Sequence, residues 1–373
     1  MPENRSSGLI AEGFTPPASK TEFLERAGSW FLNSGIQETS GGVARYYLAD
    51  VHQNRAVSTE ITGYAVSTLT YLYAATGKVQ YLDAARSAGA FLTKIAWNGP
   101  AAVFPFELTV DPLAYFFDSG IIVRGLLSLW RMTAEREFLD VAKACGRSMS
   151  DWFGAGNGEY HPVVRIAGKT PEPRANRWSR MPGCYQLKAA LAWDDLYKIT
   201  GDSDFLKWFE ELLNHSLKTH SSFLPGPEED HVMDRLHAYC YFLEGLLARS
   251  ERADVAAVLV EGVARVSKHL REVRSQFARS DVYAQLLRVR LALESAGIAS
   301  VDRLDASTEA ECLSSFQLSD QNPRLTGGFY FGRRGSELQP HINPVSTGFC
   351  LQALMMWRQY LDGELRFSLD SLI

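Results

Sequence analysis

A turn motif that occurs three times is the feature that most restricts how this chain of 373 residues can fold. The segments LYAATGKVQYLDAA from Leu72, LWRMTAEREFLDVA from Leu129 and LYKITGDSDFLKWF from Leu196 share one pattern. Each has a leucine and an aromatic residue, a threonine, a polar turn, and then an aromatic residue followed by leucine. Gly77 and Gly201 provide the left-handed residue with which helices commonly end. Each copy therefore predicts the end of one helix, a tight turn and the start of the next.

The two helices predicted around each turn differ in the distribution of their apolar residues. The second helix of the first copy, at 81–92, has its apolar residues at helical spacing on one side and charged residues elsewhere. That pattern is typical of a helix with one face on a core. The helix predicted to begin near Asp118 is apolar on nearly every side, so it needs neighbours around most of its surface.

Six such pairs can be placed along the sequence. The covered helices are predicted to begin near Thr59, Asp118, Met181, Asp234, Ser280 and Pro344. The outer helices are predicted near 20–33, 80–95, 136–152, 203–218, 252–272 and 305–315. This arrangement describes an all-α fold, an (α/α)6 toroid of six helical hairpins, with a small β-hairpin in the 327–338 loop. We expect one barrel domain over 20–365, an N-terminal extension at 1–19 and a C-terminal tail at 366–373.

Composition and missing motifs disfavour several classes of function. The net charge of −5 argues against a general nucleic-acid surface, and no apolar run reaches the roughly 18 residues of a membrane span. The five scattered cysteines and the lack of a signal-peptide pattern predict reduced thiols and a cytoplasmic protein. No dinucleotide, Walker A or zinc motif occurs, so we expect no cofactor and no metal. The acidic pair Asp194 and Asp195 lacks the third aspartate of an isoprenoid motif and lies near a helix end on the wrong rim.

Several longer motifs resemble those of a known superfamily. EITGYAVSTLTYLY, FFDSGIIVRGLLSLW, the Thr-Gly turns and GGFYFGRRGSELQPHINPVSTGFCLQALMMW are similar to segments of six-hairpin glycosidase-like proteins with the (α/α)6 barrel. The resemblance covers nearly the whole chain and implies the architecture rather than the reaction. The superfamily includes glycoside hydrolases, unsaturated-uronyl hydrolases, sugar epimerases and polysaccharide-lyase domains. The closing PHINPVSTGFCLQAL is also similar to the end of uronyl C5-epimerase helical domains.

If helices alternate up and down, the first turns of all six covered helices meet at one rim. Unpaired N–H groups and positive dipole ends gather there, and the long loops enter from that side. Glu60, Asp118 and Asp234 are the candidate catalytic carboxylates, since glycosyl chemistry uses one protonated and one ionised carboxyl group. The candidate substrate-binding residues are Arg180, Tyr185, His237, Tyr239, His341, Trp178 and Tyr330. Further residues predicted near this rim are Tyr115, Phe116, Lys188, Arg235, Asp281, Tyr283, Asn343 and Ser346.

Purely structural roles compete with each of these assignments. Asp118 and Asp234 are equally good helix N-caps, and Glu60 fits a first-turn acid that answers the helix dipole. His237 fits a hydrogen-bonded core histidine, and the tyrosines fit packing residues with bonded hydroxyl groups. A basic cluster precedes the third covered helix and either binds an anionic sugar or forms a solvated loop. Its members are Arg165, Arg174, Arg177 and Arg180.

Three hypotheses follow for the function, and the sequence leaves the oligomeric state open. The first is a glycoside hydrolase that uses paired carboxylates on an oligosaccharide, with a uronate as one candidate sugar. The second is proton transfer at a sugar, as in a sugar epimerase or polysaccharide lyase, with His237, Tyr239 or His341 as base. The third is a non-catalytic carbohydrate-binding protein of the same fold.

Overall fold

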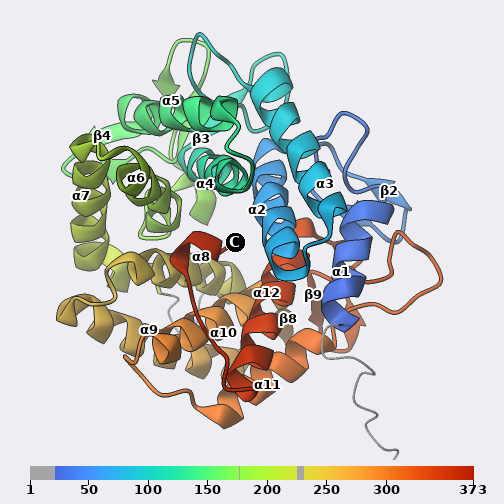
Figure 1. Cartoon of the computed structure of the whole chain (residues 1–373). Coiled ribbons are helices and arrows are strands. Elements are labelled where there is room, and N and C mark those ends of the chain that lie inside the picture. Colours follow the sequence, from blue (N-terminus) through green and yellow to red (C-terminus); the bar gives the residue numbers. More distant parts are fainter. Residues whose placement is uncertain (1–21, 176, 225–230) are drawn as a thin grey trace, which may run out of the picture.

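The structure is a computed structural model that describes residues 22–175, 177–224 and 231–373. The predicted extension at 1–19 lies outside these residues. The described residues form two concentric rings of α-helices (Figure 1). The inner helices are α2 (Thr59–Thr76), α4 (Phe116–Thr133), α6 (Gln186–Thr200), α8 (Val232–Leu246), α10 (Ser280–Ser295) and α12 (Pro344–Leu361). The outer helices are α1 (Glu22–Asn33), α3 (Val79–Ala90), α5 (Arg136–Phe153), α7 (Ser203–Thr219), α9 (Ala253–Val273) and α11 (Arg303–Ser314).

The inner ring is closed, which confirms the predicted (α/α)6 toroid. Each inner helix packs on the next in chain order, and α12 packs on α2. Short irregular helices extend this frame: a π-helical turn, η1 (Phe91–Ala96), and the 3-10 turns η2 (Trp178–Arg180), η3 (His220–Phe223), η4 (Leu247–Arg249) and η5 (Leu369–Ser371). The third covered helix begins at Gln186 instead of near Met181, because a single 3-10 turn and a loop occupy the residues before it.

The recurring motif forms the same hydrogen-bonded turn in all three copies. In the first copy, the Thr76 hydroxyl donates to the Leu72 carbonyl at 2.7 Å and accepts the Lys78 N–H at 3.3 Å. The N–H of Gly77, which has φ +68°, donates to the carbonyl of the motif's aromatic residue, Tyr73. Thr133 and Thr200 make the equivalent bonds in the other two copies. The motif therefore ends α2, α4 and α6, and the next outer helix starts after two residues in each case.

Glycines allow the inner helices to approach each other closely. A Cβ atom on Gly125 of α4 would lie 2.5 Å from the Gly63 carbonyl oxygen of α2. On the other side of α4, a Cβ atom on Gly120 would lie 2.3 Å from the Ala189 carbonyl oxygen of α6. Real Cβ atoms do not approach oxygen this closely. The short distance between the axes of these neighbouring helices therefore requires glycine, which has no Cβ atom.

Short antiparallel strands occupy the loops that lead into the inner helices. They are β1 (Tyr47–Leu48), β2 (Gln53–Asn54), β3 (Leu113–Tyr115), β4 (Gly154–Gly156), β5 (Glu159–Tyr160), β6 (Val163–Arg165), β7 (Thr170–Pro171), β8 (Phe277–Arg279), β9 (Gly332–Arg334), β10 (Glu337–Leu338) and β11 (His341–Ile342). They form sheets of order β11-β1-β2, β10-β9-β8, β3-β6-β7 and β4-β5. The β9–β10 pair confirms the hairpin predicted at 327–338. Tyr115 opposite Val163 and Arg279 opposite Gly332 fix the entry points of α4 and α10.

The last residues of the chain enter the opposite end of the ring. Leu372 and Ile373 are buried, and Figure 1 shows this end of the chain near the axis of the inner ring. Arg124 of α4 donates to the Leu372 carbonyl at 2.9 Å. Lys188 of α6 and Arg288 of α10, both fully buried, donate to the Ile373 carbonyl at 2.9 and 3.2 Å. Residues 366–373 thus pack on the barrel and close the side opposite the inner-helix N-termini.

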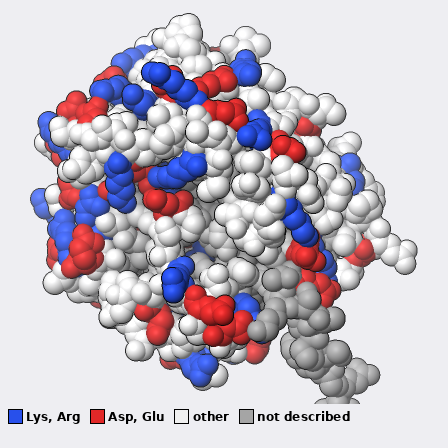
Figure 2. Space-filling model, viewed as in Figure 1, with Lys and Arg blue, Asp and Glu red and all other residues white. Residues whose placement is uncertain are grey.

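Charge is mixed on the face that Figure 2 shows, and the thiols are unpaired. Figure 2 shows acidic and basic side chains interspersed over the face that carries this closed end. No helix among the described residues is long and apolar enough to span a membrane. All five cysteines are free thiols, as their scattered spacing predicts.

Candidate functional site

A cavity of about 450 Å³ lies where the inner helices begin. The first two turns of α2, α4, α8, α10 and α12 and the loop before α6 each contribute lining residues. Glu60, Asp118 and Asp234 all line this one cavity, together with Trp178 and His237. The rim predicted from helix alternation therefore gathers the three candidate carboxylates around one hollow.

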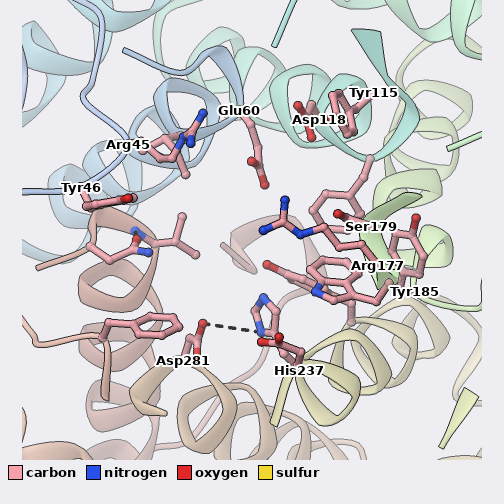
Figure 3. A pocket seen from close by; sticks show the side chains of 18 of the residues that line it. Arg45, Tyr46, Glu60, Tyr115, Asp118, Arg177, Ser179, Tyr185, His237 and Asp281 are labelled. Carbon is pink, nitrogen blue, oxygen red and sulfur yellow. Dashed lines mark hydrogen bonds and ion pairs between the residues drawn. The ribbon is translucent and has the colours of Figure 1, made fainter. Parts of the chain in front are cut away.

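The carboxyl groups of Glu60 and Asp118 stand on neighbouring inner helices at one side of the cavity (Figure 3). Glu60 follows the N-cap Ser58 and is a first-turn acid, as predicted. Asp118 is not an N-cap: α4 already begins at Phe116, because strand β3 delivers the chain two residues earlier, and Tyr115 occupies the cap position. Asp118 is therefore the third helical residue.

Burial favours the protonated form of both acids, and repulsion by the Glu60 charge adds to this effect at Asp118. Burial raises the pKa of Glu60 to about 7, against the opposing charge of Arg45. Burial raises the pKa of Asp118 well above its usual range, and the neighbouring Glu60 charge adds to that increase. Asp118 is only 6% exposed, and its Oδ2 atom has no hydrogen-bond partner within the described part of the chain. This pair can hold a proton at neutral pH and deliver it to a ligand.

Arg45 is the cation of this side of the cavity, and its own position is fixed. Its guanidinium forms an ion pair with Glu107 and lies 4.6 Å above the centre of the Phe106 ring. A cation held in this way moderates the pKa values of the two acids without neutralising them.

An ion-pair network lies on the opposite side of the cavity. Arg279 donates two hydrogen bonds to Asp281, at 3.0 and 2.7 Å, and a third to Asp234. Burial works to raise the pKa of Asp281, but the charge of Arg279 holds it below its usual range. Asp234 is thereby paired with a cation, and it is not the helix cap, because His231 holds that position.

His237 has a defined orientation within this network. Its Nδ1 atom lies 2.8 Å from Gln285 Oε1 and 3.7 Å from Asp281 Oδ2. Both neighbours are acceptors, so Nδ1 carries the hydrogen and Nε2 is left as the basic atom. Burial lowers the pKa of His237, although the Asp281 charge opposes this change, and the ring is neutral at pH 7.

Aromatic rings form much of the remaining wall. Trp178 packs edge-on against Tyr185 and His237, with ring centres 5.1 and 5.8 Å apart. Tyr241 lies 4.7 Å from Phe117 and 4.5 Å from His237 between ring centres. Such rings present flat apolar faces beside polar groups, as a sugar ring requires.

The four arginines of the basic cluster before α6 differ in their contacts. Arg165 pairs with Asp111 and Glu172, Arg174 pairs with Glu159, and Arg180 donates to the Tyr115 hydroxyl at 3.3 Å. Only Arg177 of the four lines the cavity. Most of the cluster therefore supports the loop.

Four predicted substrate-binding residues lie outside the cavity lining. Tyr239 contacts the His220 ring through its hydroxyl group at 3.0 Å. His341 packs on the Tyr46 ring, with ring centres 5.0 Å apart. The Tyr330 carbonyl accepts a hydrogen bond from the Ser280 hydroxyl at 2.7 Å. Arg180, the fourth, is held behind Tyr115 as described. Tyr185, Trp178 and His237 do line the cavity.

The sequence did not point to several of the lining residues, Arg45, Arg279 and Tyr241 among them. Arg45 lies in a loop before α2, and Arg279 is the cap residue of α10, where no spacing pattern marks either of them. Tyr241 lies two residues after Tyr239, and side chains two positions apart on a helix point to nearly opposite sides. Tyr239 therefore lies on the face of α8 that points away from the cavity. Because α8 is buried on nearly all sides, its sequence does not show which face lines the cavity.

No family model matches this chain, and no curated protein matches it by sequence. Solved structures do match it. The cellobiose 2-epimerase from Spirochaeta thermophila has a TM-score of 0.71 at 14% identity, over 91% of this chain and 96% of that one. The unsaturated glucuronyl hydrolase from Bacillus sp. GL1 has a TM-score of 0.64 at 13% identity, over 91% and 97%. A glycoside hydrolase family 76 mannosidase from Bacteroides thetaiotaomicron has 0.62 at 11%, over 91% and 99%.

These likenesses establish the fold of the chain as the (α/α)6 toroid of six-hairpin glycosidase-like proteins. Because the reactions named for these structures differ, the chemistry has to be argued from the cavity itself.

Proposed function

We propose that this protein is a carbohydrate-active enzyme that hydrolyses a glycosidic bond in the cavity at the inner-helix N-termini. The observation that carries the proposal is the Asp118 carboxyl group, which is buried, lacks a partner for Oδ2 among the described residues and lies beside a second acid. A carboxylic acid kept protonated in this way can donate its proton to the leaving oxygen of a glycoside.

Glu60 supplies the complementary base. Its pKa of about 7 leaves part of the molecules ionised at neutral pH, while burial and the Glu60 charge both favour the protonated form of Asp118. An ionised Glu60 either activates a water molecule or attacks the sugar carbon directly. Asp234 contributes less to this chemistry because its charge is already engaged by Arg279.

The remaining lining fits a sugar ring. Trp178, Tyr185 and Tyr241 offer ring faces and edges, and a cavity of about 450 Å³ is in the range of small-ligand sites. The names of several structures with this fold, a glucuronyl hydrolase and a mannosidase among them, also favour a carbohydrate substrate.

The test is release of reducing sugar from a panel of neutral and acidic oligosaccharides, comparing wild type with Asp118→Asn. We expect release by wild type and a loss of about 10²- to 10⁴-fold in the variant, the usual contribution of a general acid. Full activity of Asp118→Asn removes that residue from the mechanism. Sugar binding without turnover, unchanged in Asp118→Asn and Glu60→Gln, indicates a binding protein instead.

A second candidate, proton transfer at a sugar carbon, is favoured by the geometry of His237. Its Nδ1 hydrogen is directed to Gln285 and Asp281, so Nε2 is available as a neutral base. The cellobiose 2-epimerase with the same fold makes this chemistry worth a direct assay. Deuterium uptake from D₂O into the sugar without chain cleavage favours epimerisation, and a new ultraviolet absorbance from an unsaturated uronate favours elimination.

A further inference from the structure

Arg177 is the arginine of the cavity lining whose guanidinium has no partner within the described part of the chain. Arg45 is paired with Glu107, and Arg279 is saturated by Asp281 and Asp234. The Arg177 guanidinium makes no hydrogen bond or ion pair with any residue in 22–175, 177–224 or 231–373, yet it belongs to the cavity lining.

The loop holds Arg177 beside the cavity through its neighbour in sequence. Trp178 is wedged against Tyr185 and His237, and the Arg180 N–H donates to the Arg177 carbonyl at 2.9 Å. Figure 3 shows Arg177 entering from the side that carries Tyr185, away from Arg45. The backbone at this position is therefore tied to the aromatic wall, while the guanidinium is left for a ligand.

The other three members of the basic cluster provide an internal comparison. Arg165, Arg174 and Arg180 each have a partner in the protein and lie outside the cavity lining. Arginine satisfies its planar fork best with carboxylate, sulfate or phosphate oxygens, which accept two parallel hydrogen bonds. Arg177 is exposed, so water solvates its charge in the free protein, and an anionic group can replace that water with two parallel hydrogen bonds that a sugar hydroxyl cannot match.

The acids of the cavity leave this position available to an anion. Asp234 and Asp281 are engaged by Arg279, and burial favours the protonated form of Asp118. Among the acids of the described cavity lining, Glu60 is the one that stays partly ionised without an ion pair, and the Arg45 charge lowers its pKa. A ligand with one anionic substituent can therefore meet Arg177 at one end while its glycosidic oxygen meets Asp118.

We propose that Arg177 is a specificity-determining residue that binds an anionic group on the sugar, so that the cavity takes an acidic saccharide. The shared chemistry is an oxyanion carried by a sugar ring, either the carboxylate of a uronate or a sulfate ester. This inference rests on the proposed function for its reaction, but the anion contact itself is separable from catalysis.

The first experiment compares aryl glucosides and aryl glucuronides, both anomers of each, which differ only by CH₂OH or COO⁻ at C5. Wild type is expected to prefer a glucuronide, and Arg177→Gln is expected to lower kcat/KM for it roughly ten- to hundredfold, the effect of one charged hydrogen-bonded contact. Arg177→Lys recovers only part of the loss, because an ammonium lacks the planar fork. Arg174→Gln, on the same loop but paired with Glu159, is the matched control and keeps wild-type rates.

A binding experiment separates the two proposals. Calorimetry measures glucuronate, glucose 6-sulfate and glucose against wild type and Arg177→Gln, at low and high salt. Salt-sensitive binding of an acidic ligand that disappears in Arg177→Gln establishes the anion contact even if no glycoside is cleaved, in which case only hydrolysis fails. The tighter of the two acidic ligands identifies the source of the oxyanion.

Three results overturn the anion contact. They are a wild-type preference for glucosides, an equal loss on both glycosides in Arg177→Gln, and binding of none of the three ligands. Glucoside cleavage that is unaffected by Arg177→Gln leaves hydrolysis standing and removes the acidic-saccharide inference alone.

Discussion

Replacing Glu244 by glutamine should destabilise the barrel strongly without touching the cavity. Glu244 of α8 is fully buried between two fully buried cations, with Lys188 Nζ 3.1 Å from its Oε2 and an ion pair to Arg288. Removal of the shared negative charge leaves these cations uncompensated in an interior of low polarity. Breaking a buried ion pair from one side typically costs about 3–5 kcal/mol.

That cost converts into a measurable melting shift. Unfolding entropy near 60 °C is about 2.1 cal/mol/K per residue, so a chain of 373 residues loses about 4–6 °C of Tm for this change. Lys188→Met is the matched control, because it keeps the neutral pair of Glu244 and Arg288 and nearly the same side-chain volume. We expect it to cost less than half as much by differential scanning calorimetry.

The pH dependence of stability provides an independent check on the buried cluster, through the titration of Lys188. Burial lowers the pKa of Lys188 to about 7, against the opposing charge of Glu244, from a usual value of 10.5. The unfolded chain therefore binds this proton more tightly, and stability attributable to Lys188 rises from about pH 7 to 10.5. Lys188→Met should lose that rise. A Tm in Glu244→Gln equal to wild type, or a larger loss in Lys188→Met, refutes the description of this buried cluster.

Two further predictions concern the acid pair and the helix packing. In Arg45→Met, loss of the positive charge lets burial raise the pKa of Glu60 above about 7. The acidic limb of the pH profile of kcat/KM should then move to higher pH. An unmoved limb contradicts the effect of the Arg45 charge on Glu60. In Gly120→Ala, the new Cβ would meet the Ala189 carbonyl oxygen at 2.3 Å, and we expect a loss of about 3 kcal/mol or more by thermal unfolding. Gly201→Ala, with open space but φ +71°, should cost only about 1–2 kcal/mol, so equal losses in the two variants argue against the close helix contact.

The architecture was predictable because its signals are local. The leucine–aromatic–threonine motif ends a helix through bonds within a few residues, as those of Thr76 and Gly77 show. Such bonds depend little on the rest of the fold, so the six hairpins followed from the sequence. The placement of Glu60 and Asp118 at the inner-helix N-termini followed in turn from the alternation of helix directions.

The side-chain detail was not predictable, because it depends on helix phase and on loops. Asp118 shifted from the cap to the third position because strand β3 pairs with β6, a contact between residues 50 apart in sequence. Tyr241 replaced Tyr239 in the wall because a helix buried on all sides carries no polar face to fix its rotation. Arg45 and Arg279 reach the cavity through sheet and loop geometry that local patterns do not encode.

The central claim is that Asp118 donates a proton to the leaving oxygen, and a leaving-group comparison tests it most directly. The rates of wild type and Asp118→Asn are measured on two glycosides of the accepted sugar, one with an alkyl leaving group and one with dinitrophenol. We expect a loss of about 10²- to 10⁴-fold on the alkyl glycoside and little loss on the dinitrophenyl glycoside, whose leaving group needs no proton. Equal losses on both substrates, or no loss on the alkyl glycoside, would contradict it.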